Sequence, residues 1–198
     1  MDVITDISQL DLSKSYTYAD YLSWEFEGYV ELVKGRITVK YTPFTVHQQC
    51  LGNLASRIGM FCKRKPCWAY MRPLDVRLGG ERDAADACIK TVVQPDLLVV
   101  LDKSKIDERG CVGTPDWIIE IISPGTAIHD NKTKFDLYAE NGVGEYWIVY
   151  PGEQTVSVYV LQEGEYQPQA DYYEPGLISC HTLPELQLEW ADVFDGVD

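Results

Sequence analysis

The chain has 198 residues, of which 45% are hydrophobic and 24% are charged, a composition that argues against disorder and against two full-sized domains. Its formal net charge of -14 argues against nucleic acid binding over the whole surface. No apolar run is long enough for a membrane-spanning helix, and the first residues lack the features of a signal peptide. We therefore expect a cytoplasmic protein with one domain over residues 1–198.

The charges are distributed unevenly along the chain. All 17 basic residues lie within residues 1–134, where 18 residues are acidic, whereas residues 135–198 contain 13 acidic residues and no basic one. Residues 57–109 alone hold 11 basic and 8 acidic residues. A surface that faces phosphate groups is therefore expected only on the first two thirds of the chain.

The six cysteines are expected to be free thiols. Nothing in the sequence points to export, where disulfides persist. Cys62 and Cys67 lie too far apart for a CxxC motif, and the three histidines show no paired ligand spacing with them. A structural zinc site is therefore not predicted.

The first third of the chain shows a helix, a hairpin and a second helix. Thr17 and Asp20 have the spacing of a capping box, which predicts a short helix that ends at Gly28. Residues 29–33 and 36–41 flank a Lys-Gly pair and predict a β-hairpin whose glycine adopts a positive φ. Apolar residues at helical spacing over residues 44–64 predict the first long helix.

The rest of the chain alternates between strands and helices. Strands are predicted for residues 67–78, 92–100, 115–123 and 145–151, with a helix over residues 127–141 that stops at Gly142. A hairpin around Glu163-Gly164 and a short helix over residues 190–194 complete the chain. This order indicates an α/β or α+β fold around a mixed sheet.

Two acidic residues stand beside apolar strands. Asp96 follows Pro95 at the start of one strand, and Glu120 lies within another, where a charge is costly unless it is paired or bound to a metal. Two carboxylates can hold Mg²⁺, and a nearby ammonium can stabilise the charge that develops when a phosphodiester is hydrolysed. Asp130 and Lys134 lie on one face of the following helix.

Each of these residues also has a purely structural explanation. Asp130 and Lys134 have the spacing of an ordinary solvated ion pair. Glu120 could be a buried acid satisfied by backbone donors or a cation, and Asp96 could cap a turn. Tyr138, Tyr146 and Trp147 are most simply core aromatic residues.

The sequence resembles a family of nucleases. The segments ELVKGRI, QPDLLVV and IIEIISPGTAIHDNKTKFDLYAENGVGEYWIVYP together resemble the Uma-type family of restriction-endonuclease-like proteins, within the PD-(D/E)XK superfamily. The resemblance spans about residues 16–195. It implies a restriction-endonuclease-like mixed β-sheet flanked by helices.

The resemblance also implies roles for particular residues. Asp96 and Glu120 match the two acidic metal ligands, Lys134 matches the catalytic lysine on the following helix, and Glu31 matches an additional acidic residue at the cleft. Ile122 stands where the superfamily usually has its lysine, so Lys134 must reach back from the helix after a turn at residues 123–126. His47 matches a histidine common in the family, although a lone histidine on a helix is usually a polar residue near the edge of a core.

Two functions of different classes follow. The first is a Mg²⁺-dependent endonuclease that hydrolyses phosphodiester bonds of DNA, which it contacts through residues 1–134. The second is a catalytically inactive nuclease-fold module that binds nucleic acid or protein. Because cutting both strands of a duplex needs two active sites, we expect a homodimer, with residues 145–150 and 155–161 supplying the intersubunit surface.

Overall fold

The computed structural model describes residues 4–26, 28–40, 44–122 and 127–197, except for the side chains of residues 40 and 127–131. The chain forms two compact units and passes between them five times. The first unit comprises Met1–Thr42, Pro73–Gln94 and Lys105–Thr114, and the second comprises Pro43–Arg72, Pro95–Ser104 and Pro115–Asp198. The single domain expected over residues 1–198 stays a prediction.

The first unit is built on a six-stranded sheet in the order β2-β1-β5-β4-β8-β7, in which only β4 and β8 are parallel. The predicted hairpin is confirmed, and both Lys34 (φ 50°) and Gly35 (φ 79°) of its turn have positive φ. The strands of this sheet are β1 (Tyr29–Val33), β2 (Arg36–Lys40), β4 (Val76–Arg77), β5 (Val92–Val93), β7 (Ile106–Asp107) and β8 (Gly110–Val112).

The helices of the first unit are short. The predicted capping box of Thr17 and Asp20 starts α1 (Tyr18–Tyr21). The expectation that this helix continues to Gly28 is wrong, because Trp24 already pairs with Ile4 in a parallel β-bridge and therefore needs extended backbone. Two 3-10 helices, η1 (Ile7–Gln9) and η2 (Asp86–Cys88), complete this unit.

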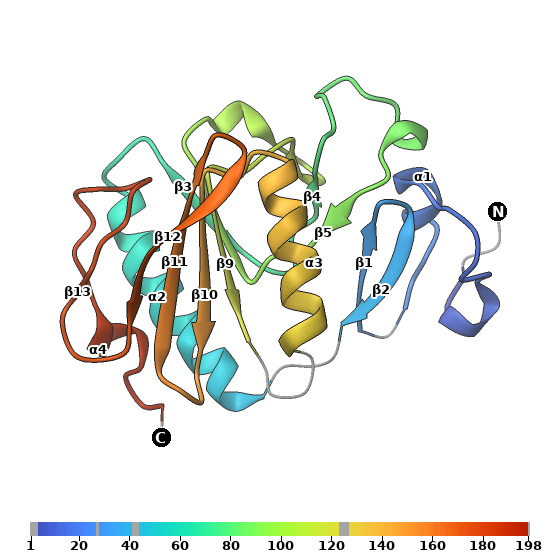
Figure 1. Ribbon diagram of the computed structural model, residues 1–198. Helices are drawn as coiled ribbons and strands as arrows, with labels where there is room; N and C mark the ends of the chain where they lie inside the picture. The colour runs from blue at the N-terminus through green and yellow to red at the C-terminus, as the bar shows by residue number, and fades with distance from the viewer. Residues whose placement is uncertain (1–3, 27, 41–43, 123–126, 198) are drawn as a thin grey trace. The chain divides into compact units, whose positions relative to one another are not determined.

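The second unit is a mixed sheet covered by a helix on each face, in the order β12-β11-β10-β9-β6-β3 (Figure 1). The buried side of α2 packs on one face against Trp117, Ile119 and Trp147. On the other face, Tyr138 of α3 packs against Tyr146. The elements are α2 (Thr45–Cys62), β3 (Trp68–Met71), β6 (Leu97–Val100), η3 (Lys103–Lys105), β9 (Trp117–Ile121), α3 (Ala127–Glu140), β10 (Glu145–Tyr150), β11 (Thr155–Gln162), β12 (Glu165–Tyr172), β13 (Leu177–Ile178), β14 (Leu188–Glu189) and α4 (Trp190–Val193).

Two of the predicted strands are divided between the two sheets. The run over residues 67–78 separates into β3 and β4, and the run over residues 92–100 separates into β5 and β6. Pro73 and Pro95 lie at the two breaks. Each interrupts its strand because proline has no N–H to donate to a sheet. The break at Pro95 leaves Asp96 immediately before a strand of the second unit.

The C-terminal segment is held to the second sheet by Glu145, the first residue of β10. Its buried carboxylate accepts hydrogen bonds from Trp147 Nε1 (2.7 Å) and from the backbone N–H groups of His181 (3.0 Å) and Thr182 (2.6 Å). The expectation that β10 supplies an intersubunit surface is wrong, because β10 is buried between β9 and β11. Among the described residues, no helix is both long and apolar enough to cross a membrane.

Candidate active site

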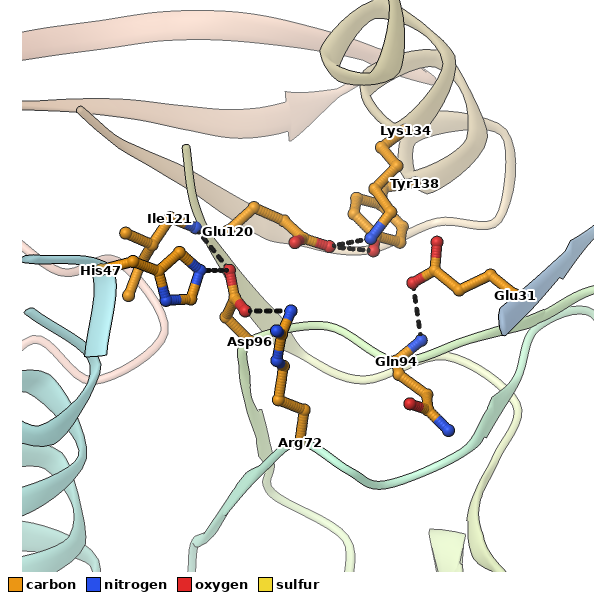
Figure 2. Close-up of polar contacts among 9 residues, drawn as sticks. All are labelled: Glu31, His47, Arg72, Gln94, Asp96, Glu120, Ile121, Lys134 and Tyr138. Atoms are coloured by element: carbon orange, nitrogen blue, oxygen red, sulfur yellow. Dashed lines mark hydrogen bonds and ion pairs between the residues drawn. The ribbon is translucent and has the colours of Figure 1, made fainter. Parts of the chain in front are cut away.

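Asp96 is surrounded by three groups of the second unit (Figure 2). Its Oδ2 accepts a hydrogen bond from the Ile121 backbone N–H at 2.7 Å and lies 3.1 Å from His47 Nε2. Its Oδ1 lies 2.9 Å from Nη1 of Arg72. Burial by itself would raise the pKa of Asp96, but His47, Arg72 and the backbone N–H together hold this pKa below its usual value. Asp96 is therefore a carboxylate in the folded protein.

The sheet register explains why these groups meet. Leu97 pairs with Ile119 across the antiparallel strands β6 and β9, so Asp96 and Glu120 are the next residues along that ladder. Met71 pairs with Leu97 across β3 and β6, which leaves Arg72 beside Asp96. His47 comes from the first turn of α2. Neighbouring strand positions and one helix thus bring Arg72 and His47 to Asp96.

Glu120 points to the sheet face that α3 covers, because it alternates with Ile119 and Ile121, which belong to the core under α2. Its Oε1 accepts hydrogen bonds from Lys134 Nζ and Tyr138 Oη, each at 2.6 Å (Figure 2). Lys134 and Tyr138 are four residues apart on α3 and so share one face of that helix. All three residues are buried, and the exposed fraction of Lys134 is only 4%.

The sequence predicted that Lys134 returns from the helix toward the acidic pair, and the structure places its ammonium on Glu120. Its catalytic role stays a prediction. The turn proposed at residues 123–126 and the side chain of Asp130 lie outside the described residues.

Glu31 belongs to the first unit, where it lies on β1 and is buried. Its Oε1 accepts a hydrogen bond from the Gln94 backbone N–H at 2.9 Å (Figure 2). The Gln94 side chain in turn donates to Asp75 Oδ1 at 2.8 Å. Glu31 therefore fixes the backbone two residues before Asp96 in the sequence, and its membership of the active site stays a prediction.

Sequence reasoning missed two of these residues and left one open. Arg72 was not singled out, since a lone arginine before a proline carries no local signal of its partner. Tyr138 was predicted as a core aromatic, and it is buried as predicted, but its hydroxyl also donates to Glu120. His47, for which a core edge and a site were both considered, is buried against Asp96.

The two carboxylates are suitable ligands for a hard cation. Mg²⁺ is commonly held by one or two carboxylates, with water or substrate oxygens completing its shell, and Asp96 and Glu120 provide two carboxylates at neighbouring ladder positions. In the structure each of them faces a cation, Arg72 or Lys134. Within the described part of the chain, no three His, Cys, Asp or Glu side chains form a metal-binding group, so water or phosphate would have to supply most of the ligands.

The second unit is thus a mixed sheet with a helix on each face, with Glu120 within β9 and Asp96 directly before β6. The family model Uma2, described as "Putative restriction endonuclease", matches residues 18–191, and the chain belongs to this family. A protein from Anabaena variabilis ATCC 29413, described as a "putative nuclease belonging to DUF820", has a similar crystal structure with a TM-score of 0.73. The two sequences are 24% identical, and the match covers 92% of this chain and 99% of the other. Comparison with curated proteins gives no match.

Proposed function

We propose that this protein is a Mg²⁺-dependent endonuclease that hydrolyses phosphodiester bonds of DNA. Membership of the Uma2 family supports the nuclease class. The observation that carries the proposal is the buried ammonium of Lys134, which lies 2.6 Å from a carboxylate oxygen of Glu120, next to Asp96 in the sheet. Two acids can hold the metal ion, and a lysine can stabilise the charge that develops during such hydrolysis.

The roles of the residues follow from their contacts. Asp96 and Glu120 would hold Mg²⁺, which when bound supplies the positive charge that acidifies water and offsets charge on the phosphate. Lys134 would add a second positive charge, stabilising the transition state and orienting the attacking water. Tyr138 donates to the same oxygen as Lys134 and so fixes the Glu120 carboxylate.

His47 and Arg72 are positioning residues in this proposal. Both contact the carboxylate of Asp96, and both favour its ionised form. They would hold Asp96 in one orientation, ready for a cation.

The substrate surface is assigned to the basic part of the chain. Between Glu31 and Asp75 the sequence contains eight basic residues and no acidic one. This stretch includes α2 and β3, which carry His47 and lead to Arg72. Phosphate contacts through these side chains would make DNA affinity fall as salt rises. The homodimer stays a prediction, which light scattering at micromolar protein tests.

The alternative is a catalytically inactive nuclease-fold module. The observation that favours it is that both carboxylates are already neutralised by protein cations. The two functions differ in whether the acidic pair binds metal.

Calorimetric titration with Mg²⁺ and cleavage of supercoiled plasmid DNA, with and without a chelator, separate the two functions. The endonuclease predicts metal binding and chelator-sensitive nicking in the wild type, and loss of both in Asp96→Asn. Lys134→Met should lose cleavage and keep metal binding, whereas Lys132→Met, an exposed lysine on the same helix, should behave as the wild type. Absence of metal binding and cleavage in a folded wild type would refute the proposal.

A further inference from the structure

Two cysteines lie side by side at one end of the second sheet. Cys62 is the last residue of α2 and Cys67 directly precedes β3. Their Sγ atoms are 2.8 Å apart, and both are free thiols. A turn places them together, because the Lys65 backbone N–H donates to the Cys62 carbonyl (3.2 Å) and the Cys67 N–H donates to the Lys65 carbonyl (2.8 Å).

The two thiols line a groove that small molecules can enter. The groove has a volume of about 650 Å³ and runs between α2 and β3. Exposed Met60 and Lys63 also line it, so it reaches solvent. Both cysteines are nevertheless largely buried, with exposed fractions of 7% and 3%. The groove therefore gives a small reagent a path to both cysteines.

The pair does not have the surroundings of a metal site. Over the described residues, no His, Cys, Asp or Glu joins Cys62 and Cys67 to make a group of three ligands. Two adjacent thiols without further ligands are suited instead to forming a bond with each other.

We propose that Cys62 and Cys67 form a dithiol site that low-molecular-weight disulfides oxidise to an intramolecular disulfide. One thiol of the pair loses its proton and attacks a sulfur of the small disulfide, which gives a mixed disulfide and releases one small thiolate. The second thiol then loses its proton and attacks the cysteine sulfur of the mixed disulfide. The Sγ–Sγ bond forms and a second small thiolate leaves.

The step is balanced in atoms and electrons. Two cysteine thiols are oxidised, one small disulfide is reduced to two thiols, and the two cysteine protons end on those thiols. Burial, and then the adjacent Cys67 thiol, raises the pKa of Cys62 to about 12. Because exchange proceeds through the thiolate, oxidation is slow at neutral pH and faster in alkaline solution.

The disulfide would connect the two elements that hold Asp96. His47 lies at the start of α2, and Arg72 follows the end of β3, so the bond would join the opposite ends of these elements. Any effect on catalysis rests on the proposed function. The chemical modification does not, and its test uses no activity measurement.

The test is peptide mapping of the full chain after treatment with glutathione disulfide at mildly alkaline pH. Remaining thiols are blocked with N-ethylmaleimide, and the protein is digested with trypsin without reduction. Trypsin cleaves after Lys63 and Arg64, between the two cysteines, so the disulfide joins two peptides that are otherwise separate. We expect these joined peptides from the wild type, in an amount that grows with pH.

Two variants and one internal control make the outcome decisive. Cys62→Ser must abolish the joined peptides, whereas Cys50→Ser, which changes another buried cysteine of α2, must retain them. The exposed Cys88 should carry glutathione and so shows that the oxidant is active. If Cys88 is modified while Cys62 and Cys67 are both recovered with N-ethylmaleimide, the proposal is overturned.

A second measurement tests whether the folded protein accommodates the bond. The urea midpoint of the oxidised wild type should lie above that of the reduced wild type, because the cross-link restricts the unfolded chain. Cys62→Ser should show no such difference. A lower midpoint for the oxidised wild type would overturn the inference that the native positions of the two sulfurs suit a disulfide.

Discussion

Replacing Lys134 by methionine should destabilise the protein strongly, because it leaves Glu120 as a buried charge without its cation. At the Nζ to Oε1 distance of 2.6 Å, the Coulomb attraction is about 6 kcal/mol at an effective dielectric constant of about 20. Desolvation of the two ions offsets most of this attraction, yet removal of one partner of a buried pair costs about 3–5 kcal/mol. Since Tyr138 continues to donate to Glu120, we expect about 3 kcal/mol.

A double-mutant cycle measured by urea unfolding tests this reasoning. The double variant Glu120→Gln/Lys134→Met removes both charges, so it should recover at least about 2 kcal/mol relative to Lys134→Met alone. Lys132→Met, at an exposed position of α3, should change the free energy of unfolding by less than about 0.5 kcal/mol. The reasoning fails if Lys134→Met is as stable as the Lys132 variant, or if the double variant is no more stable than Lys134→Met.

Three further predictions concern stability. Glu145→Ala should lower the free energy of unfolding by about 3 kcal/mol or more, because it removes the acceptor of one buried and two partly buried donors. Urea unfolding measures this, and a loss below about 1 kcal/mol would contradict it. Gly110→Ala should lower the free energy of unfolding by at least about 2 kcal/mol in the same assay. Gly110 has a φ of +122°, and an added Cβ would lie 2.2 Å from the Asp75 carbonyl oxygen. Near-wild-type stability would refute this close approach. Burial, and then the Asp75 carboxylate, raises the pKa of Tyr18 from 10.0 to about 12. The folded state therefore holds the hydroxyl proton more tightly than the unfolded state does. Stability should fall as pH rises from about 10 to about 12. Unfolding measured across that range should show a shallower fall for Tyr18→Phe, and equal slopes for the two proteins would contradict the assignment.

Local patterns in the sequence were enough to predict much of the fold. The hairpin of β1 and β2 follows from a Lys-Gly turn between two apolar strands, and α2 and α3 follow from helical spacing. Other elements have no such pattern. β4 and β5 are only two residues long, too short to show a period, and each was predicted as part of a longer strand that continues in the other sheet.

The acidic pair was predictable because each carboxylate interrupts or begins an apolar strand. Its partners were less predictable, since they depend on contacts distant in sequence. Arg72 reaches Asp96 only because β3 pairs with β6, and His47 reaches it because α2 packs on that sheet. Lys134 was identified by resemblance, while its burial follows from the packing of α3 and has no signal in the helix itself.

The interleaving of the two units has a consequence for synthesis on the ribosome. The first unit is assembled from three separate stretches, and its β4 pairs with β8, which ends at Val112. Residues 43–72 therefore emerge before the sheet that precedes them in sequence can be completed, and they wait for β9 and β10 before their own sheet can form. The strands β9 and β10 are synthesised after α2 and β3, and such distant pairings are also slow to form. For much of translation, α2 and β3 therefore remain without most of their final partners. No single truncation can release either unit intact, and a shortened chain would expose the apolar face of α2.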